Sequence, residues 1–414
     1  MQILNVQQLK KEFGDEILFE NVSFSINDND RLALIGPNGN GKSTLIKILL
    51  GQIDKTSGDV SFAKGTTIGY LSQDVISNVD NTLNDEVLSV FNDLILQEKN
   101  LNDLENMISN DPNNLKLIDE YGKKQNDFLE KGGYNYHYLI NMMLSKFGFH
   151  KNDLIRKISS FSGGERTKIA FVKLLLIKPN LLILDEPTNH LDLSTIEWLE
   201  QYLKSYQGAL LFVSHDRYFI DALANKIVEI ENKTSSFYKG NYSYYIEEKK
   251  LRYTQQLNAY NNQQKEIARL KRFIEYYMPK PRFVNRAKDR EKKLEHMKLI
   301  DKPLQEKHNL KLSFNGEVYE GKQILEVKDL SIGYDKPLVS DINFTIYGKD
   351  HLAIMGDNGC GKTTLLEALI SHQHVLNGTI KYLRPVNIGY IKQHQIDLNG
   401  ELTVLEEMKK DFPS

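Results

Sequence analysis

The sequence is poor in cysteine, long apolar runs and net charge, and each of these shortages excludes or disfavours a class of protein. Its 414 residues include one cysteine, Cys360, so no disulfide can form within the chain, and scarce cysteine is typical of a reducing compartment. It contains no run of about 18 apolar residues, and its first residues lack an apolar signal core. The formal net charge of -2 does not by itself indicate a nucleic-acid or membrane partner. We therefore expect a cytoplasmic protein without a membrane span.

What the sequence does contain is an internal repeat. The segment IGPNGNGKST at 35–44 returns as MGDNGCGKTT at 355–364, so that Lys42 corresponds to Lys362 at an offset of 320 residues. Segments 20–26 and 68–73 recur at the same offset. Each copy reads as short strands, a glycine loop, a helix and another strand, which predicts an α/β cassette of the P-loop nucleotide-hydrolase type.

Between the two copies the chain changes character. Residues 241–310 are polar, with apolar residues at helical spacing that prolines at 279 and 281 interrupt, which predicts an antiparallel helical hairpin. Residues 280–293, at its tip, hold seven Lys or Arg and two acidic residues. A second, acidic helical segment, about 75–150, is inserted in the first cassette. We predict a first cassette at 1–240, a basic linker at 241–310 and the opening part of a second cassette at 322–414.

Both glycine loops match the phosphate-binding pattern GxxxxGK[ST], in which backbone N–H groups at a helix N-terminus face phosphate oxygens. Lys42 would reach the β- and γ-phosphates of ATP and Ser43 would ligate Mg²⁺, with Lys362 and Thr363 in the same roles in the second copy. The predicted nucleotide-binding residues are Gly36, Pro37, Asn38, Gly39, Asn40, Gly41, Lys42, Ser43 and Thr44, and Gly356, Asp357, Asn358, Gly359, Cys360, Gly361, Lys362, Thr363 and Thr364. Cys360 stands at a variable position of the loop.

Two carboxylates follow an apolar strand in LLILDEPTNHLD, residues 181–192. Asp185 is placed to hold Mg²⁺ and Glu186 to activate the attacking water. Together with the loops, this string resembles the ATP-binding cassette family. The resemblance implies that Ser162, Gly163 and Gly164 contact the γ-phosphate held by an opposite cassette. It also implies further roles for Gln73 near Mg²⁺ and water, Gln393 as its repeat, His215 beside the γ-phosphate, and Phe13 and Tyr334 as adenine-stacking aromatics. For these two aromatics, a place in the core is the alternative.

Within the family, the chain resembles the ABC-F class, whose members bind the ribosome instead of pumping solutes. That resemblance implies that the linker reaches rRNA and peptidyl-tRNA. The predicted RNA-binding residues are Lys280, Arg282, Arg286, Lys288 and Arg290. Both a general translation factor and an antibiotic-resistance protein that protects the ribosome fit this class. Two other hypotheses stay open: the ATPase subunit of a membrane transporter, and a regulatory fragment that does not hydrolyse ATP.

The chain departs from the family pattern in its second copy, which has no signature, no Asp-Glu pair and no switch histidine within these 414 residues. In the family, each ATP lies between one cassette's phosphate loop and the other cassette's signature. Neither composite site is therefore complete within one molecule. Two copies could pair through their first cassettes, each lending its signature to the other's Lys42 site.

We predict that ATPase activity of this 414-residue chain rises faster than linearly with protein concentration, because a complete site requires two molecules. Ser162→Arg should abolish the activity, and an intact second cassette should remove the concentration dependence. Steady-state phosphate release over a dilution series measures both effects. Strictly linear activity from a monomeric preparation would contradict the prediction.

Overall fold

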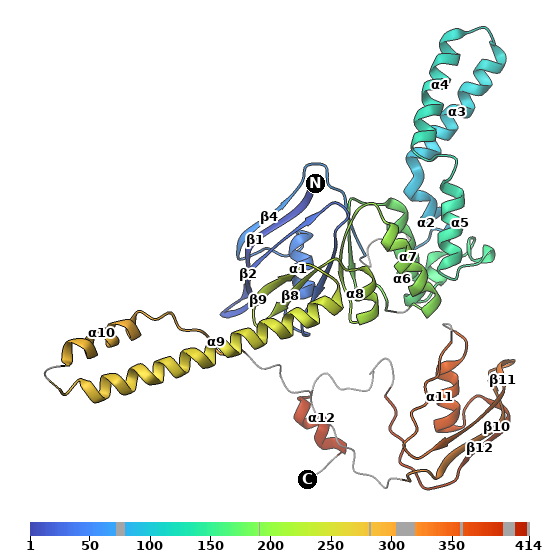
Figure 1. Cartoon of the computed structure of the whole chain (residues 1–414). Coiled ribbons are helices and arrows are strands. Elements are labelled where there is room, and N and C mark those ends of the chain that lie inside the picture. The colour runs from blue at the N-terminus through green and yellow to red at the C-terminus, as the bar shows by residue number, and fades with distance from the viewer. Residues whose placement is uncertain are drawn as a thin grey trace. The chain divides into compact units, whose positions relative to one another are not determined.

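The computed structural model describes residues 1–71, 79–189, 191–280, 283–303, 319–356, 359–391 and 402–411. Contacts divide the chain into two compact units, 1–307 and 308–414 (Figure 1). No helix within these described residues is both long and apolar enough to cross a membrane. The domain limits expected at residues 240 and 310 stay a prediction.

The largest sheet in the described part of the first unit has six strands, in the order β5-β6-β7-β3-β8-β9. The strands are β3 (Arg31–Ile35), β5 (Ile68–Tyr70), β6 (Leu181–Asp185), β7 (Ala209–Val213), β8 (Lys226–Glu231) and β9 (Thr234–Tyr238). All neighbours are parallel except β8 and β9. β3 and β7 are continuous runs of buried residues, as expected for parallel strands covered on both faces.

Two hydrophobic cores lie on the two faces of this sheet, because successive strand residues point to opposite sides. Leu32 and Leu34 of β3 belong to one core, which α1 (Lys42–Leu49) and a second, antiparallel sheet cover. That sheet consists of β1 (Gln2–Phe13), β2 (Glu16–Asn27) and β4 (Ser57–Phe62). Ala33 and Ile35 belong to the other core, which helices cover. These are α5 (Tyr136–Lys146), α6 (Gly163–Ile177), α7 (Leu193–Ser205) and α8 (Arg217–Leu223).

The inserted segment forms a helical arm, as predicted. It begins with α2 (Leu83–Leu88), continues with α3 (Asn92–Asn110) and α4 (Leu115–Glu130), which pack against each other, and returns through α5 (Figure 1). A buried ion pair fixes its root: the fully buried carboxylate of Glu86 on α2 lies 2.6 Å from Nζ of Lys173 on α6. Asn81 donates a hydrogen bond to the other Glu86 oxygen at 2.9 Å. The arm is thus joined to α6 at its base.

The linker is a helical hairpin, again as predicted. α9 (Tyr242–Tyr277) ends just before Pro279, and α10 (Val284–Glu295) packs back on it. Gln263 of α9 donates a hydrogen bond to the carbonyl oxygen of Lys298 at 2.8 Å, and Lys293 pairs with Glu266 at 2.8 Å. Leu270 and Ala287 are the buried apolar residues of these two helices beyond the root of α9.

The second unit repeats only part of the first. The sheet β11-β10-β12 has the order of β2-β1-β4, and its small core lies against α11. Its elements are β10 (Gln323–Gly333), β11 (Pro337–Tyr347), α11 (Lys362–Ser371), β12 (Val375–Tyr382) and α12 (Val404–Asp411). The fold class is therefore confirmed: an α/β cassette with an inserted helical arm, a helical-hairpin linker and a partial second cassette.

One sequence expectation fails in the second unit. Residues 351–355 and 388–390, the repeats of β3 and β5, form no strand. In the first unit, β3 lies between β7 and β8, and β5 pairs with β6. The described part of the second unit has no counterparts of β6, β7 and β8. Without these partners the segment at 351–355 stays exposed, with Leu352 54% and Met355 78% accessible.

We predict that Lys173→Met destabilises the first unit by about 3–5 kcal/mol, because it leaves the buried Glu86 carboxylate without its cationic partner. Trp198, the only tryptophan, packs edge-on against Phe147 in the same unit, so its fluorescence during urea unfolding reports on this unit. Lys204→Met, which breaks the exposed pair with Glu200, is the control and should cost about 0–1 kcal/mol. Equal losses in the two variants would contradict the prediction.

Candidate functional site

The first phosphate loop connects β3 to α1, and its backbone requires glycine. Gly36, Gly39 and Gly41 have φ values of 149°, 84° and 86°. A Cβ atom at position 36 would lie 2.2 Å from the carbonyl oxygen of Ile230 in β8. Asn40 donates a side-chain hydrogen bond to that same oxygen at 3.1 Å. The sequence patterns did not identify this support from β8, since nothing in residues 36–43 signals a partner so far along the chain.

Lys42 begins α1 and is directed into the loop. Its Nζ donates hydrogen bonds to the carbonyl oxygens of Gly36, at 2.7 Å, and Pro37, at 3.1 Å. Burial lowers the pKa of Lys42, while the negative charges of Glu186 and Asp185 act in the opposite direction. The Lys42 ammonium and the N-terminus of α1 therefore both favour an anion in the loop.

The sheet brings the predicted magnesium-binding residues together. Ser43 Oγ donates a hydrogen bond to Oδ2 of Asp185, the last residue of β6, at 3.1 Å. A hydroxyl and a carboxylate are oxygen ligands of the kind Mg²⁺ takes, with phosphate and water oxygens completing its shell. No cluster of three His, Cys, Asp or Glu side chains suited to a metal occurs in the described residues.

Glu186 adopts an unusual backbone conformation, with φ of 50°. Its N–H donates to the carbonyl oxygen of Val213 at the end of β7, at 3.0 Å. Its Oε2 accepts a hydrogen bond from the backbone N–H of His215 at 3.2 Å, and His215 Nε2 lies 3.5 Å from Oε1. Among the described atoms, the buried Oε1 has no hydrogen-bond donor. The hydrogen-bonding capacity of this oxygen is therefore unused within the described structure.

These groups line one pocket of about 410 Å³. Loop residues 38, 39 and 41–44, together with Asp185, Glu186 and His215, contribute to it, and Phe13 also lines it. Phe13 is 55% exposed, and the ammonium of Lys11 lies 4.7 Å from its ring centroid. The structure thus places Phe13 outside the core and beside the loop. The predicted Gln73 lies outside the described residues.

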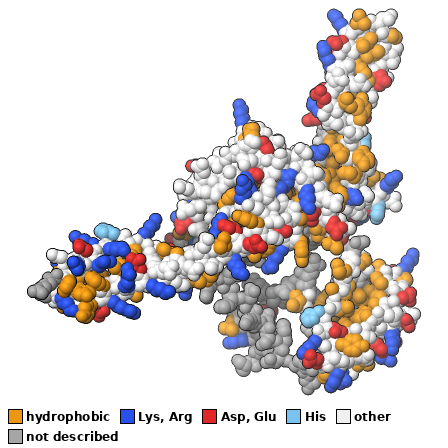
Figure 2. Space-filling view, in the orientation of Figure 1, with side chains coloured by type: hydrophobic (Ala, Val, Ile, Leu, Met, Phe, Trp, Pro, Cys, Tyr) orange, Lys and Arg blue, Asp and Glu red, His pale blue; other side chains and the backbone are white. Residues whose placement is uncertain are grey.

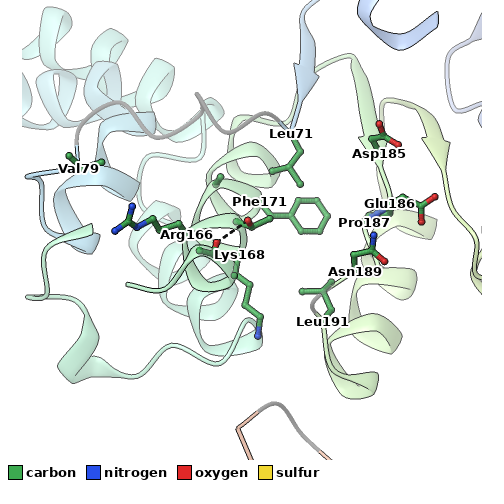
Figure 3. A pocket seen from close by; sticks show the side chains of 14 residues that line it. Leu71, Val79, Arg166, Lys168, Phe171, Asp185, Glu186, Pro187, Asn189 and Leu191 are labelled. Carbon is green, nitrogen blue, oxygen red and sulfur yellow. Dashed lines mark hydrogen bonds between the residues drawn. The ribbon is translucent and has the colours of Figure 1, made fainter. Parts of the chain in front are cut away.

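The signature segment begins α6. Ser162 is the N-cap: its Oγ accepts from the N–H of Glu165 at 3.3 Å, and the Glu165 carboxylate accepts from the N–H of Ser162 at 2.8 Å. Gly163 and Gly164 line a second pocket, of about 600 Å³, with Asp185, Glu186 and Phe171. Figure 3 shows Phe171 facing Glu186, Pro187 and Asn189 across it. Ser162, Gly163 and Gly164 are not among the described residues lining the Lys42 pocket.

In the second unit, the described residues of the loop repeat features of the first loop. Lys362 donates to the carbonyl oxygen of Gly356 at 2.8 Å, the contact that Lys42 makes with Gly36. Gly359 and Gly361 again have positive φ, and Thr363 is exposed whereas Thr364 is buried. Cys360 is exposed, and Tyr334 is 61% exposed with its ring 4.4 Å from that of His374. The predicted Asp357, Asn358 and Gln393 lie outside the described residues.

At the linker tip, positive side chains surround an aromatic cluster. Figure 2 shows Lys and Arg gathered with hydrophobic side chains over the end of the linker formed by α10 and the facing part of α9. Nζ of Lys280 lies 3.3 Å from the ring centroid of Tyr276, which is 61% exposed, and Arg290 lies over Phe273 at 5.6 Å. Arg286, Lys288 and Arg290 are exposed. The predicted Arg282 lies outside the described residues.

Comparison with known proteins adds to this geometry. A family model described as ABC transporter matches residues 19–189 and 339–412, and a second model with that description matches 228–314. The chain is 39% identical to the "Putative ATP-binding protein YdiF" of Bacillus subtilis and 34% identical to "ABC transporter F family member 2" of Arabidopsis thaliana. It is 30% identical to "Energy-dependent translational throttle protein EttA" of Mycobacterium tuberculosis.

These three matches cover 100%, 97% and 98% of this chain, in the same order. They cover 65%, 61% and 72% of the relatives. The chain thus spans about two thirds of the length of the curated relatives it matches.

Proposed function

The chain belongs to the ABC-F class of the ATP-binding cassette family, and on this basis we propose that it hydrolyses Mg²⁺-ATP at the Lys42 pocket and acts on the ribosome. One observation carries the first part: Lys42, the Ser43–Asp185 pair and the Glu186–His215 pair surround a single pocket. A lysine, oxygen ligands for a metal and a carboxylate with an uncommitted oxygen are the groups that phosphoryl transfer to water requires.

In the proposed reaction, Ser43 and Asp185 would hold Mg²⁺, whose charge would offset that of the phosphate oxygens. Lys42 exchanges its carbonyl partners for the β- and γ-phosphates, and the N–H groups at the start of α1 bind the same oxygens. Oε1 of Glu186 accepts a proton from the attacking water, while the His215 N–H keeps the other carboxylate oxygen in place. His215 Nε2, 3.5 Å from the carboxylate, contacts the γ-phosphate once ATP is bound.

The proposed action on the ribosome rests on two further observations. The first is the relative named as a translational throttle, which matches nearly the whole chain. The second is the basic, aromatic linker tip, which suits an RNA backbone with exposed bases beside it. We therefore propose rRNA and peptidyl-tRNA as the partners, in the cytoplasm, with a translation factor and a ribosomal protection protein as the two forms of this role. A transporter subunit would leave the charged tip without a function.

We predict that Glu186→Gln keeps ATP affinity but lowers hydrolysis by about 10²–10⁴-fold, because the amide cannot accept the water proton. Fluorescent-nucleotide binding and phosphate release measure the two effects. Glu200→Gln, on the surface of α7, is the control and should change neither. In a version with a complete second cassette, the Glu186 variant should stay on ribosomes. Unchanged turnover would refute the role of Glu186.

We predict that reversing Lys280, Arg286 and Lys288 to Glu weakens ribosome binding and flattens its salt dependence. For every phosphate that the tip no longer neutralises, the log–log salt slope should fall by roughly 0.7–0.9. ATP affinity should not change, because the tip lies outside the pocket. Reversal of the exposed Lys64, Lys233 and Lys239 is a charge-matched control on the cassette. Equal ribosome pelleting by the tip variant and the wild type across a salt series would exclude the tip as the RNA contact.

A further inference from the structure

A buried carboxylate in β8 is bonded mainly to the linker helix. Glu229 is 5% exposed. It accepts hydrogen bonds from Tyr238 of β9 at 3.3 Å, and from Tyr245 and Lys249 of α9 at 2.6 Å and 2.7 Å. A buried charge is tolerated only with such partners. The root of α9 therefore supplies two of the three donors that the described structure gives this carboxylate.

The next residue along β8 supports the phosphate loop. The carbonyl oxygen of Ile230 accepts the Asn40 side chain and lies where a Cβ of residue 36 would be. Glu229 itself is paired in the sheet with Ile35, which directly precedes the loop. A small displacement of this part of β8 would therefore alter both the backing of Gly36 and the bond that holds Asn40.

Lys249 contacts both neighbours of Ile230. Its Nζ lies 2.7 Å from Glu229 and 2.9 Å from Oε2 of Glu231. Burial alone lowers its pKa, but hydrogen bonds to the two carboxylates outweigh burial and leave the pKa of Lys249 raised. The ammonium thus holds the strand on either side of the carbonyl that supports the loop, and it belongs to the helix whose far end carries the basic tip.

We propose that Lys249, with Tyr245 and Glu229, is a positioning residue of the phosphate loop, through which the linker helix sets the affinity of the Lys42 pocket for ATP. The residues act through Ile230 and do not touch the nucleotide. This inference rests on the proposed function, because it assigns a regulation to the same pocket. The linker thus has a second role besides RNA contact, because a displacement of the hairpin is transmitted through the first residues of α9 to the phosphate loop.

The test is ATP affinity of the full chain without ribosomes, measured with a fluorescent ATP analogue. Lys249→Met should raise the Kd for ATP about fivefold or more, Tyr245→Phe by a smaller factor, and Lys249→Arg should restore most of the affinity. Lys293→Met, which breaks the Glu266 pair in the same hairpin away from β8, should leave the Kd unchanged.

A double variant separates positioning from stability. Glu229→Gln with Lys249→Met removes the buried carboxylate charge together with its ammonium partner and leaves only the partly exposed Glu231 without that ammonium. Unfolding followed by Trp198 fluorescence should therefore lie closer to that of the wild type than does unfolding of Lys249→Met alone. The Kd should nevertheless stay raised, since no ammonium then holds the strand on either side of Ile230. A return of the Kd to the wild-type value in the folded double variant, or an unchanged Kd in folded Lys249→Met, would overturn the inference. Failure of the wild type to bind ATP would instead refute the proposed function, and with it this regulation.

Discussion

The arrangement of the site depends on one constraint, the pairing of β3 between β7 and β8. The phosphate loop leaves the sheet at the end of β3, Asp185 ends β6, and the end of β7 both accepts the N–H of Glu186 and leads to His215. Parallel strands place these ends on one edge. The second unit separates what the loop does by itself from what the neighbouring strands supply. Lys362 still donates a hydrogen bond to the carbonyl oxygen of Gly356, a contact within the loop. Among the described residues, however, the segment at 351–355 has no partner strands, and no counterpart of Asp185 or Glu186 lies beside this loop.

The sequence predicted whatever is encoded within a few neighbouring residues. The loop, the carboxylate pair and the serine-glycine segment 162–164 are local patterns, and the helices of arm and linker follow from apolar spacing. The repeat predicted strands at 351–355 and 388–390 that do not form, because a strand motif does not encode whether the strands it pairs with are present. The sequence also did not predict the left-handed backbone of Glu186 or the hydrogen bond that its N–H donates to Val213 at the end of β7. The roles of the individual site residues stay predictions.

Several residues of the candidate site perform structural tasks as well. Glu165 closes the capping box of α6 with Ser162. Phe161 is buried against Phe149 and lies under the guanidinium of Arg156. Both residues therefore stabilise the segment that contains Ser162, Gly163 and Gly164. The segment before it is bonded to the root of the arm, where Ile158 donates to the carbonyl oxygen of Asn81.

The length of α9 gives its anchored root a mechanical meaning. Its 36 residues rise by about 1.5 Å each, so the helix is a rod of roughly 54 Å. A rod of that length is a lever: a tilt of about 5° at Tyr245 and Lys249 moves the far end by roughly 5 Å, on the order of one helical turn. Conversely, a force applied at the tip exerts a large torque on the hydrogen bonds of Glu229, because the lever is long. A shift at the root of α9 that is too small to alter the fold of the cassette can thus change which groups the linker tip contacts.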